Sequence, residues 1–154
     1  MGQDVETVEL LIPASAEEIF ALIADPRRHH EFDGSGTVLK ANKVPDHLGL
    51  GESFGMDMKI GFFPYKMVST VIEYEENRRL AWQTRPNVGL LGKVIGGRIW
   101  RYELEPRDGG TLVKESWDIS QERVKAAVEP MRTGTRKAMQ ATLERISKLV
   151  SPAP

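Results

Sequence analysis

The sequence has no cysteine, which excludes disulfide bonds, thiol catalysis and cysteine-ligated metal sites. It also lacks any apolar run near the ~18 residues that a membrane-spanning helix needs, and its N-terminus lacks a basic region followed by an apolar one. We therefore expect a cytoplasmic protein without a membrane span. Neither sign of charge is in excess: the net charge is −1, which gives no general field for attracting nucleic acid or an anionic membrane.

The length and composition are typical of one globular domain. The chain has 154 residues, of which 40% are hydrophobic and 28% charged. A chain of this length buries roughly 68–70% of its unfolded surface, so it needs no metal or disulfide to hold its core. We predict a single domain over residues 1–150 and a disordered tail over 151–154, and we find no motif that calls for a cofactor.

Start and stop signals divide the first part of the chain into a strand and two short helices. Apolar residues alternate over residues 5–12, which predicts a strand. Ser15 and Glu18 form a capping box, which begins a helix. Asp25-Pro26 repeats the start signal, because an N-cap residue precedes a proline in the first helical position. A short second helix is predicted from there, ending before Gly34.

A run of short strands with turn signals fills the middle of the chain, which favours an antiparallel meander. The predicted strands are Val38–Lys43, Ser53–Ile60, Tyr65–Tyr74, Leu80–Arg85, Arg98–Glu105 and Thr111–Ile119.

The last two strands flank Asp108-Gly109, a strong signal for a tight hairpin. A two-residue turn at that point fixes the register, placing aromatic and apolar residues on one face and an opposite-charge pair on the other. The predicted pairs are Leu104 with Val113, Tyr102 with Glu115 and Trp100 with Trp117 on the first face, and Glu103 with Lys114 and Arg101 with Ser116 on the second.

Residues 121–150 have the period of an amphipathic helix. Pro130 should kink this helix or mark its true start. Gly134 is predicted on the inner side, where the backbone could approach a ligand or a strand. The apolar side is predicted to hold Val124, Ala127, Val128, Met131, Ala138, Met139, Thr142, Ile146 and Leu149.

This order of elements resembles the helix-grip fold of the START-like (SRPBCC) superfamily, and within it the bacterial polyketide cyclase/dehydrase-like group. The resemblance covers nearly the whole chain. It implies an α+β fold in which a curved antiparallel sheet of about seven strands surrounds a long C-terminal helix, with two short helices after the first strand. The matching segments are Ile12–Phe20, Ile23–Pro26, Gly51–Phe54, Tyr102–Pro106 and Gly109–Leu112.

The resemblance also implies a cavity for an apolar small molecule between the sheet and the helix. A plain filled core would use the same side chains, so this alternative stays open. Methionines that adapt their shape and aromatic side chains with polar atoms favour the cavity. The residues expected to line it are Phe54, Met56, Met58, Trp82, Trp100, Tyr102, Glu115, Trp117, Met131, Thr135 and Met139.

Glu115 is the main candidate for chemistry, since the register turns its carboxylate inward between apolar neighbours. A buried carboxylate needs a partner or must take up a proton. Tyr102 and Arg98 are the candidate partners. Glu115 and Tyr102 are predicted to bind an oxygenated ligand or to transfer a proton to it. The alternatives are a satisfied structural hydrogen bond or a strand twist that brings Glu115 to solvent.

Two other segments attract attention. His29 and His30 are adjacent, so on a helix they point about 100° apart and cannot easily share one ion. We predict no metal site, and we place the pair on polar surface near the mouth of the cavity. Residues 85–97 are rich in glycine yet apolar, which fits a mobile lip, a homodimer contact or an extended hairpin packed on its own sheet.

The functional prediction is a cytoplasmic protein that binds a hydrophobic small molecule, whether polyketide-, lipid- or aromatic-like. It would act as a carrier, a sensor or a cyclase/dehydrase-like enzyme. The alternative is a protein-interaction module, such as a chaperone activator, with a filled core. An open pocket of ~300 Å³ or more would favour ligand binding.

Overall fold

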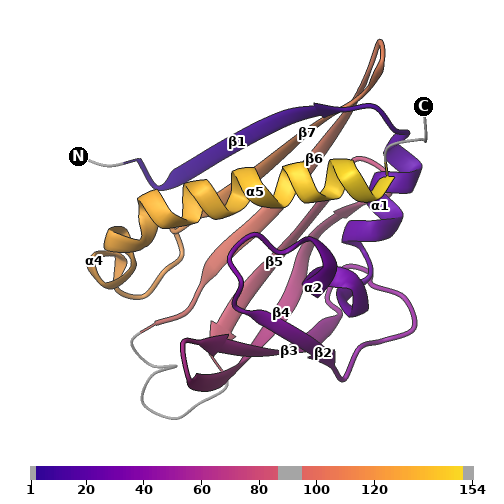
Figure 1. Ribbon diagram of the computed structural model, residues 1–154. Coiled ribbons are helices and arrows are strands. Elements are labelled where there is room, and N and C mark those ends of the chain that lie inside the picture. The colour runs from indigo at the N-terminus through magenta and orange to yellow at the C-terminus, as the bar shows by residue number, and fades with distance from the viewer. Residues whose placement is uncertain (1–2, 87–94, 151–154) are drawn as a thin grey trace.

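The computed structural model describes residues 3–86 and 95–150. Seven strands form one antiparallel sheet in the order β1-β7-β6-β5-β4-β3-β2, and the long helix α5 packs across its concave face (Figure 1). This confirms the predicted helix-grip architecture. The elements are β1 Val5–Ile12, α1 Ala16–Ile23, η1 Pro26–Arg28, α2 His29–Phe32, β2 Val38–Asn42, β3 Ser53–Ile60, β4 Phe63–Glu75, β5 Arg79–Pro86, β6 Arg98–Arg107, β7 Gly110–Asp118, α4 Lys125–Val128, η2 Glu129–Met131 and α5 Arg132–Val150.

Side-chain caps begin the early helices where the sequence predicts them. The Ser15 hydroxyl accepts a hydrogen bond from the Glu18 amide at 3.2 Å, and the Asp25 carboxylate accepts one from the Arg27 amide at 3.1 Å. Each cap satisfies an amide that the first helical turn leaves without a partner. The chain therefore breaks into short helices that close one end of the sheet beside the C-terminal half of α5 (Figure 1).

The β6–β7 hairpin has the register that its turn predicts. Tyr102 pairs with Glu115 and Trp100 pairs with Trp117, as expected for a turn at Asp108-Gly109. On the outer face Arg101 binds Glu73, with 2.6 Å between Nη2 and Oε2. One face of the hairpin is therefore available for the interior.

The segment before α5 differs from the continuous helix that the sequence predicts. The chain first forms α4 and the 3-10 turn η2, which contains Pro130, and α5 begins two residues after this proline. Proline has no amide hydrogen and its ring clashes with the preceding helical turn, so it separates the two pieces. The helical phase is lost across this break. Four residues predicted to face inward are exposed: Val124, Ala127 and Met131, together with Leu149 near the C-terminal end.

A close glycine contact holds the loop after α2 against α5. The Gly34 amide donates a hydrogen bond to the Thr142 hydroxyl at 2.9 Å, and a Cβ at Gly34 would lie 2.3 Å from the Ala138 carbonyl oxygen. No such approach occurs at Gly134, where a Cβ would meet no atom within 4 Å. The expectation of a close backbone approach at Gly134 is therefore wrong, and Gly34 makes that approach instead.

Candidate ligand-binding site

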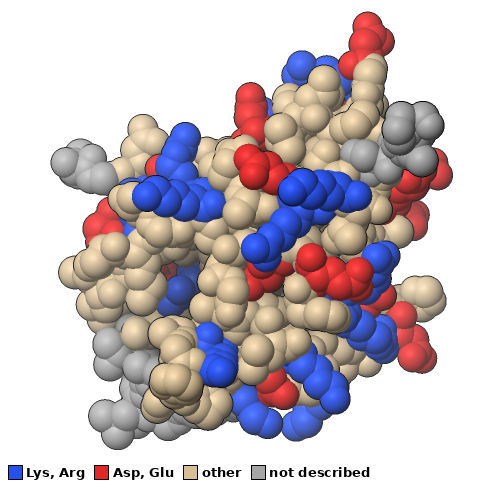
Figure 2. All heavy atoms as spheres, viewed as in Figure 1, with Lys and Arg blue, Asp and Glu red and all other residues tan. Residues whose placement is uncertain are grey.

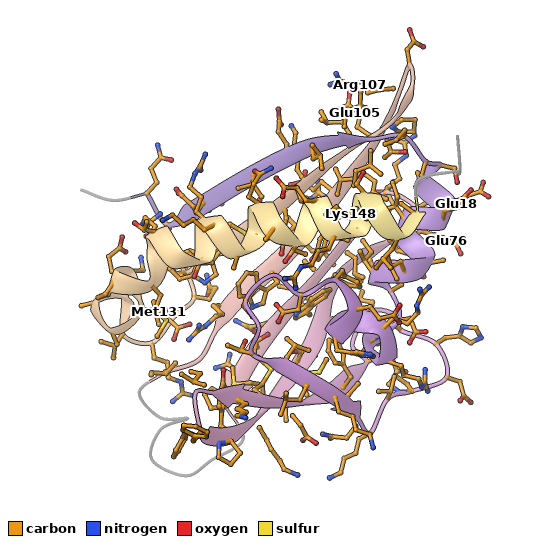
Figure 3. All side chains as sticks on the ribbon, viewed as in Figure 1. Glu18, Glu76, Glu105, Arg107, Met131 and Lys148 are labelled. Carbon is orange, nitrogen blue, oxygen red and sulfur yellow. The ribbon has the colours of Figure 1, made fainter. Side chains whose placement is uncertain are left out.

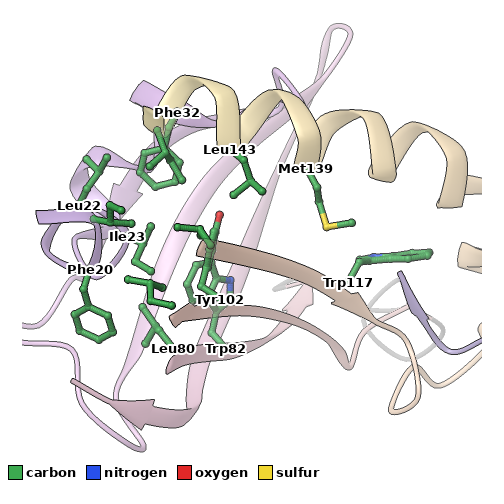
Figure 4. Close-up of a cluster of buried hydrophobic side chains, with 14 of the residues drawn as sticks. Phe20, Leu22, Ile23, Phe32, Leu80, Trp82, Tyr102, Trp117, Met139 and Leu143 are labelled. Carbon is green, nitrogen blue, oxygen red and sulfur yellow. The ribbon is translucent and has the colours of Figure 1, made fainter. Parts of the chain in front are cut away.

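The inner faces of β6 and β7 place Glu115 opposite Tyr102 beneath α5. Both side chains are buried, and the Tyr102 hydroxyl points toward α5 (Figure 4). The Tyr102 hydroxyl lies close enough to the Glu115 carboxylate to act on its pKa as a hydrogen-bond donor. The carboxylate oxygen Oε1 has no hydrogen-bond partner among the described residues. A buried acid group with one unused oxygen thus lies in a largely apolar interior.

The surroundings of Glu115 favour its protonated form. Burial raises the pKa of Glu115 to about 8, the Tyr102 hydrogen bond lowers it, and the charge of Asp33 raises it. Burial, followed by the charge of Glu115, raises the pKa of Tyr102 well above its usual value. At pH 7 a carboxyl with this pKa is roughly nine-tenths protonated. The pair can therefore both donate and accept hydrogen bonds.

His29 belongs to the interior, contrary to the prediction of polar surface. Its ring stacks on Trp82 at 5.1 Å between centroids and meets Phe54 edge-on at 5.7 Å. Its Nε2 lies 2.9 Å from the Ile23 carbonyl oxygen, so the neutral ring carries its proton on Nε2. Burial lowers the pKa of His29 to about 4. Only packing in three dimensions reveals this role, because the sequence shows His29 beside a second polar histidine.

The other predicted wall residues do not all lie together. In Figure 4 Met139 reaches from α5 toward Trp117, whereas Trp82 and Tyr102 lie in a second group, below Leu143 of α5 and beside the side chains of α1. Phe54 contacts Trp82 at 5.8 Å between ring centroids. Phe54, Met56, Trp82, Trp117 and Met139 are buried, Met58, Trp100 and Thr135 are half-buried, and Met131 is 42% exposed.

Arg98 pairs with Glu122 rather than with the predicted partner Glu115. Its Nε lies 3.6 Å from Glu122 Oε2, and its Nη1 lies 3.9 Å from the sulfur of Met131. Glu122 is fully buried, and its other oxygen accepts a hydrogen bond from the Gly96 amide. The sequence gives no sign of this pair, since Glu122 follows the end of β7 in a polar segment.

The face of the molecule is hollowed below the first turns of α5, with basic side-chain atoms recessed in the hollow (Figure 2). Figure 3 labels Met131 beside this place, and Met131 contacts Arg98. The hollow thus lies on the side of the molecule where Arg98 and Met131 meet. Residues 87–94, which make up most of the predicted lip at 85–97, lie outside the described residues. The role of this segment as a lip stays a prediction.

Two further surface hollows lie away from the inner face. One, of about 230 Å³, lies between α1 and the loop before β3 and includes His47 and Leu48. The other, of about 240 Å³, lies along the outer edge near Arg79 and Lys114. Within residues 3–86 and 95–150, no group of three or more acidic or histidine side chains is arranged to hold a metal ion. The same residues include no helix long and apolar enough to cross a membrane.

Known proteins resemble the chain in sequence as well as in fold. Residues 5–151 match the family described as polyketide cyclase / dehydrase and lipid transport. The uncharacterized protein Rv0088 of Mycobacterium tuberculosis is 40% identical over 118 residues, which are 76% of this chain and 47% of that protein. The chain therefore spans about half the length of the curated relatives that it matches.

Solved structures show the same fold at low identity. Protein CV1439 from Chromobacterium violaceum has a TM-score of 0.76 and 13% identity, covering 97% of this chain and 99% of its own. DynU16, from the dynemicin biosynthetic locus, has a TM-score of 0.66 and 16% identity, covering 97% of this chain and 49% of its own. Since the family match extends over nearly the whole sequence, the chain belongs to the polyketide cyclase / dehydrase and lipid transport family.

Proposed function

We propose that the protein binds an uncharged apolar molecule that carries at least one oxygen, held between α5 and the inner face of the sheet. The observation that carries this proposal is Glu115 Oε1, a buried polar atom with no hydrogen-bond partner among the described residues. An unsatisfied buried polar group costs about 1–3 kcal/mol. A ligand oxygen beside Glu115 and Tyr102 offsets that cost, and the apolar body of the ligand contacts Met139 and Trp117.

The ligand would make part of its own space, because the two surface hollows near His47 and near Arg79 lie elsewhere. Met139 reaches toward Trp117 at the proposed site, and methionine is unbranched and fills irregular space in several conformations. Access runs through the hollow near Arg98 and Met131. A protonated Glu115 can also give its proton to a ligand carbonyl, so a cyclisation or dehydration step is compatible with the same arrangement.

The second candidate function is a protein-interaction module with a filled core. It is favoured by the burial of several predicted wall residues, among them Trp82, Trp117 and Met139. Native mass spectrometry of the purified protein separates the two candidates. A retained apolar molecule supports ligand binding.

The test of the site itself compares 1-naphthol with 1-methylnaphthalene, which differ in the hydroxyl group. Quenching of tryptophan fluorescence measures both affinities in the wild type and in Glu115→Leu, which cannot form the hydrogen bond. We expect the variant to lose about tenfold affinity for 1-naphthol, the value of one hydrogen bond, and none for 1-methylnaphthalene. Glu103→Leu, on the outer face of β6, is the control and should bind both probes like the wild type.

Two results would contradict the proposal. If neither probe binds and no apolar molecule is retained, the results favour a protein-interaction module with a filled core. If both probes bind but Glu115→Leu leaves the affinity for 1-naphthol unchanged, Glu115 is not part of the site.

A further inference from the structure

The turn between β3 and β4 exposes a compact group of large apolar side chains. Ile60, Phe62 and Phe63 are 59%, 98% and 66% exposed, and they are separated only by Gly61. Gly61 has a φ of +60°, the left-handed conformation that a tight turn requires and glycine adopts freely. Soluble domains seldom present several large apolar side chains together at a protruding turn, and such groups mark interaction sites.

The three side chains form one patch at the end of the hairpin. Ile60 pairs directly with Phe63 across the turn, and Phe62 lies between them. Lysines flank the patch on both strands: Lys59 places its ammonium 5.7 Å from the Phe62 ring centroid, and Lys66, three residues beyond Phe63, lies 3.7 Å from the Asp57 carboxylate. An apolar tip with flanking lysines matches the surface of an anionic bilayer.

The tip lies at the same end of the molecule as the hollow below α5. In Figure 1 the β3–β4 turn, α4 and the first turn of α5 all lie at the left. Burial raises the pKa of Tyr65, two residues beyond Phe63, while a hydrogen bond with Thr37 and the charge of Arg98 lower it. Arg98 in turn contacts Met131 at the hollow. A surface that receives this tip would therefore face the hollow.

We infer that the β3–β4 tip inserts into the surface of an anionic lipid bilayer. A protein partner is the poorer fit, because a stable protein interface buries about 800 Å² on each side, more than three side chains at a turn supply. A bilayer needs only a few inserted apolar groups, and the lysines then lie at the level of the headgroups. The attraction is local, since the net charge of the chain is −1.

Flotation with vesicles of phosphatidylcholine, with and without phosphatidylglycerol, tests this inference. We expect the wild type to bind the vesicles with phosphatidylglycerol and F62S/F63S to lose affinity by about tenfold for each aromatic ring. Leu50→Ser is the matched control, because Leu50 is 71% exposed in the loop before β3, and it should bind like the wild type. Replacing Lys59 and Lys66 by glutamine should remove the preference for phosphatidylglycerol. Phe62→Trp should shift its fluorescence to the blue on binding.

The inference is overturned if the wild type ignores both kinds of vesicle, or if Leu50→Ser loses as much affinity as F62S/F63S. A third result is that the wild type self-associates without binding vesicles and that F62S/F63S abolishes this self-association. This result would overturn the inference and assign the tip to a contact with a second copy of the chain. Glu115→Leu should bind vesicles normally. Vesicle binding and ligand binding can therefore fail separately.

Discussion

Replacing Glu115 by glutamine should leave the free energy of unfolding in acid nearly unchanged. It should strongly change how this free energy depends on pH. Glutamine has the shape of the protonated carboxyl and still accepts the hydrogen bond from Tyr102, but it cannot ionise. In the wild type, burial raises the pKa of Glu115 from 4.5 to about 8. The variant removes this titration and leaves the packing in place.

The sign and size of the effect follow from the raised pKa. A group whose pKa is higher in the folded state contributes stability below its unfolded pKa and loses it as the pH rises through the folded pKa. The wild type should therefore lose stability between pH 4.5 and pH 8 through this group. At about 1.4 kcal/mol per unit, the full loss is roughly 5 kcal/mol. The free energy of unfolding of the variant minus that of the wild type should therefore be roughly 3 kcal/mol larger at pH 7 than at pH 4.5.

Urea unfolding followed by tryptophan fluorescence, repeated from acid to mildly alkaline pH, measures the effect. The quantity to plot is the free energy of unfolding of Glu115→Gln minus that of the wild type, because other titrating groups cancel in the difference. Tyr102→Phe is the companion variant: it removes the hydrogen bond that lowers the pKa of Glu115, so the loss of stability should extend to higher pH. A difference between Glu115→Gln and the wild type that stays flat across this range would refute the reasoning.

Three further predictions concern the supports of the site. Burial lowers the pKa of His29 to about 4, so the free energy of unfolding should fall by roughly 3 kcal/mol through this group as the pH drops from 6.5 to 4. NMR should show a neutral His29 ring until about pH 4. Gly34→Ala should cost about 2 kcal/mol or more in thermal unfolding, because its Cβ meets the Ala138 carbonyl oxygen at 2.3 Å, whereas Gly49→Ala, with open space around it, should cost far less. Ser15→Ala should cost about 1 kcal/mol in urea unfolding through the lost cap; no loss would contradict the contact.

The features that the sequence predicts well depend on local signals. The turn at Asp108-Gly109 and the alternation of the flanking strands together determine the register, so Tyr102 and Glu115 could be paired in advance. The first strand and the caps at Ser15 and Asp25 were also predictable, because each depends on residues within a few positions. A one-residue slip would have turned Glu115 outward, so this register determines the candidate site.

Two of the features that it misses depend on contacts between distant segments. His29 is buried because α2 folds back onto Trp82, and the chemistry of histidine alone does not indicate this. The pairing of Arg98 with Glu122 depends on the path of the chain after β7. The inward orientation of Met131 was predicted from a helical phase that the break at Pro130 interrupts. The first two differences arise where tertiary packing overrides a local pattern, and the third follows from the local effect of proline on the helix.

The charge states of the interior limit what the proposed ligand can be. His29 has a pKa of about 4 and Glu115 a pKa of about 8, so between these values both buried groups are neutral. Arg98 pairs with Glu122 at the hollow, outside this neutral region. A charged group carried to Glu115 would lose its hydration without meeting an opposite charge, which is costly in a buried site. An uncharged oxygen at Glu115 avoids this cost.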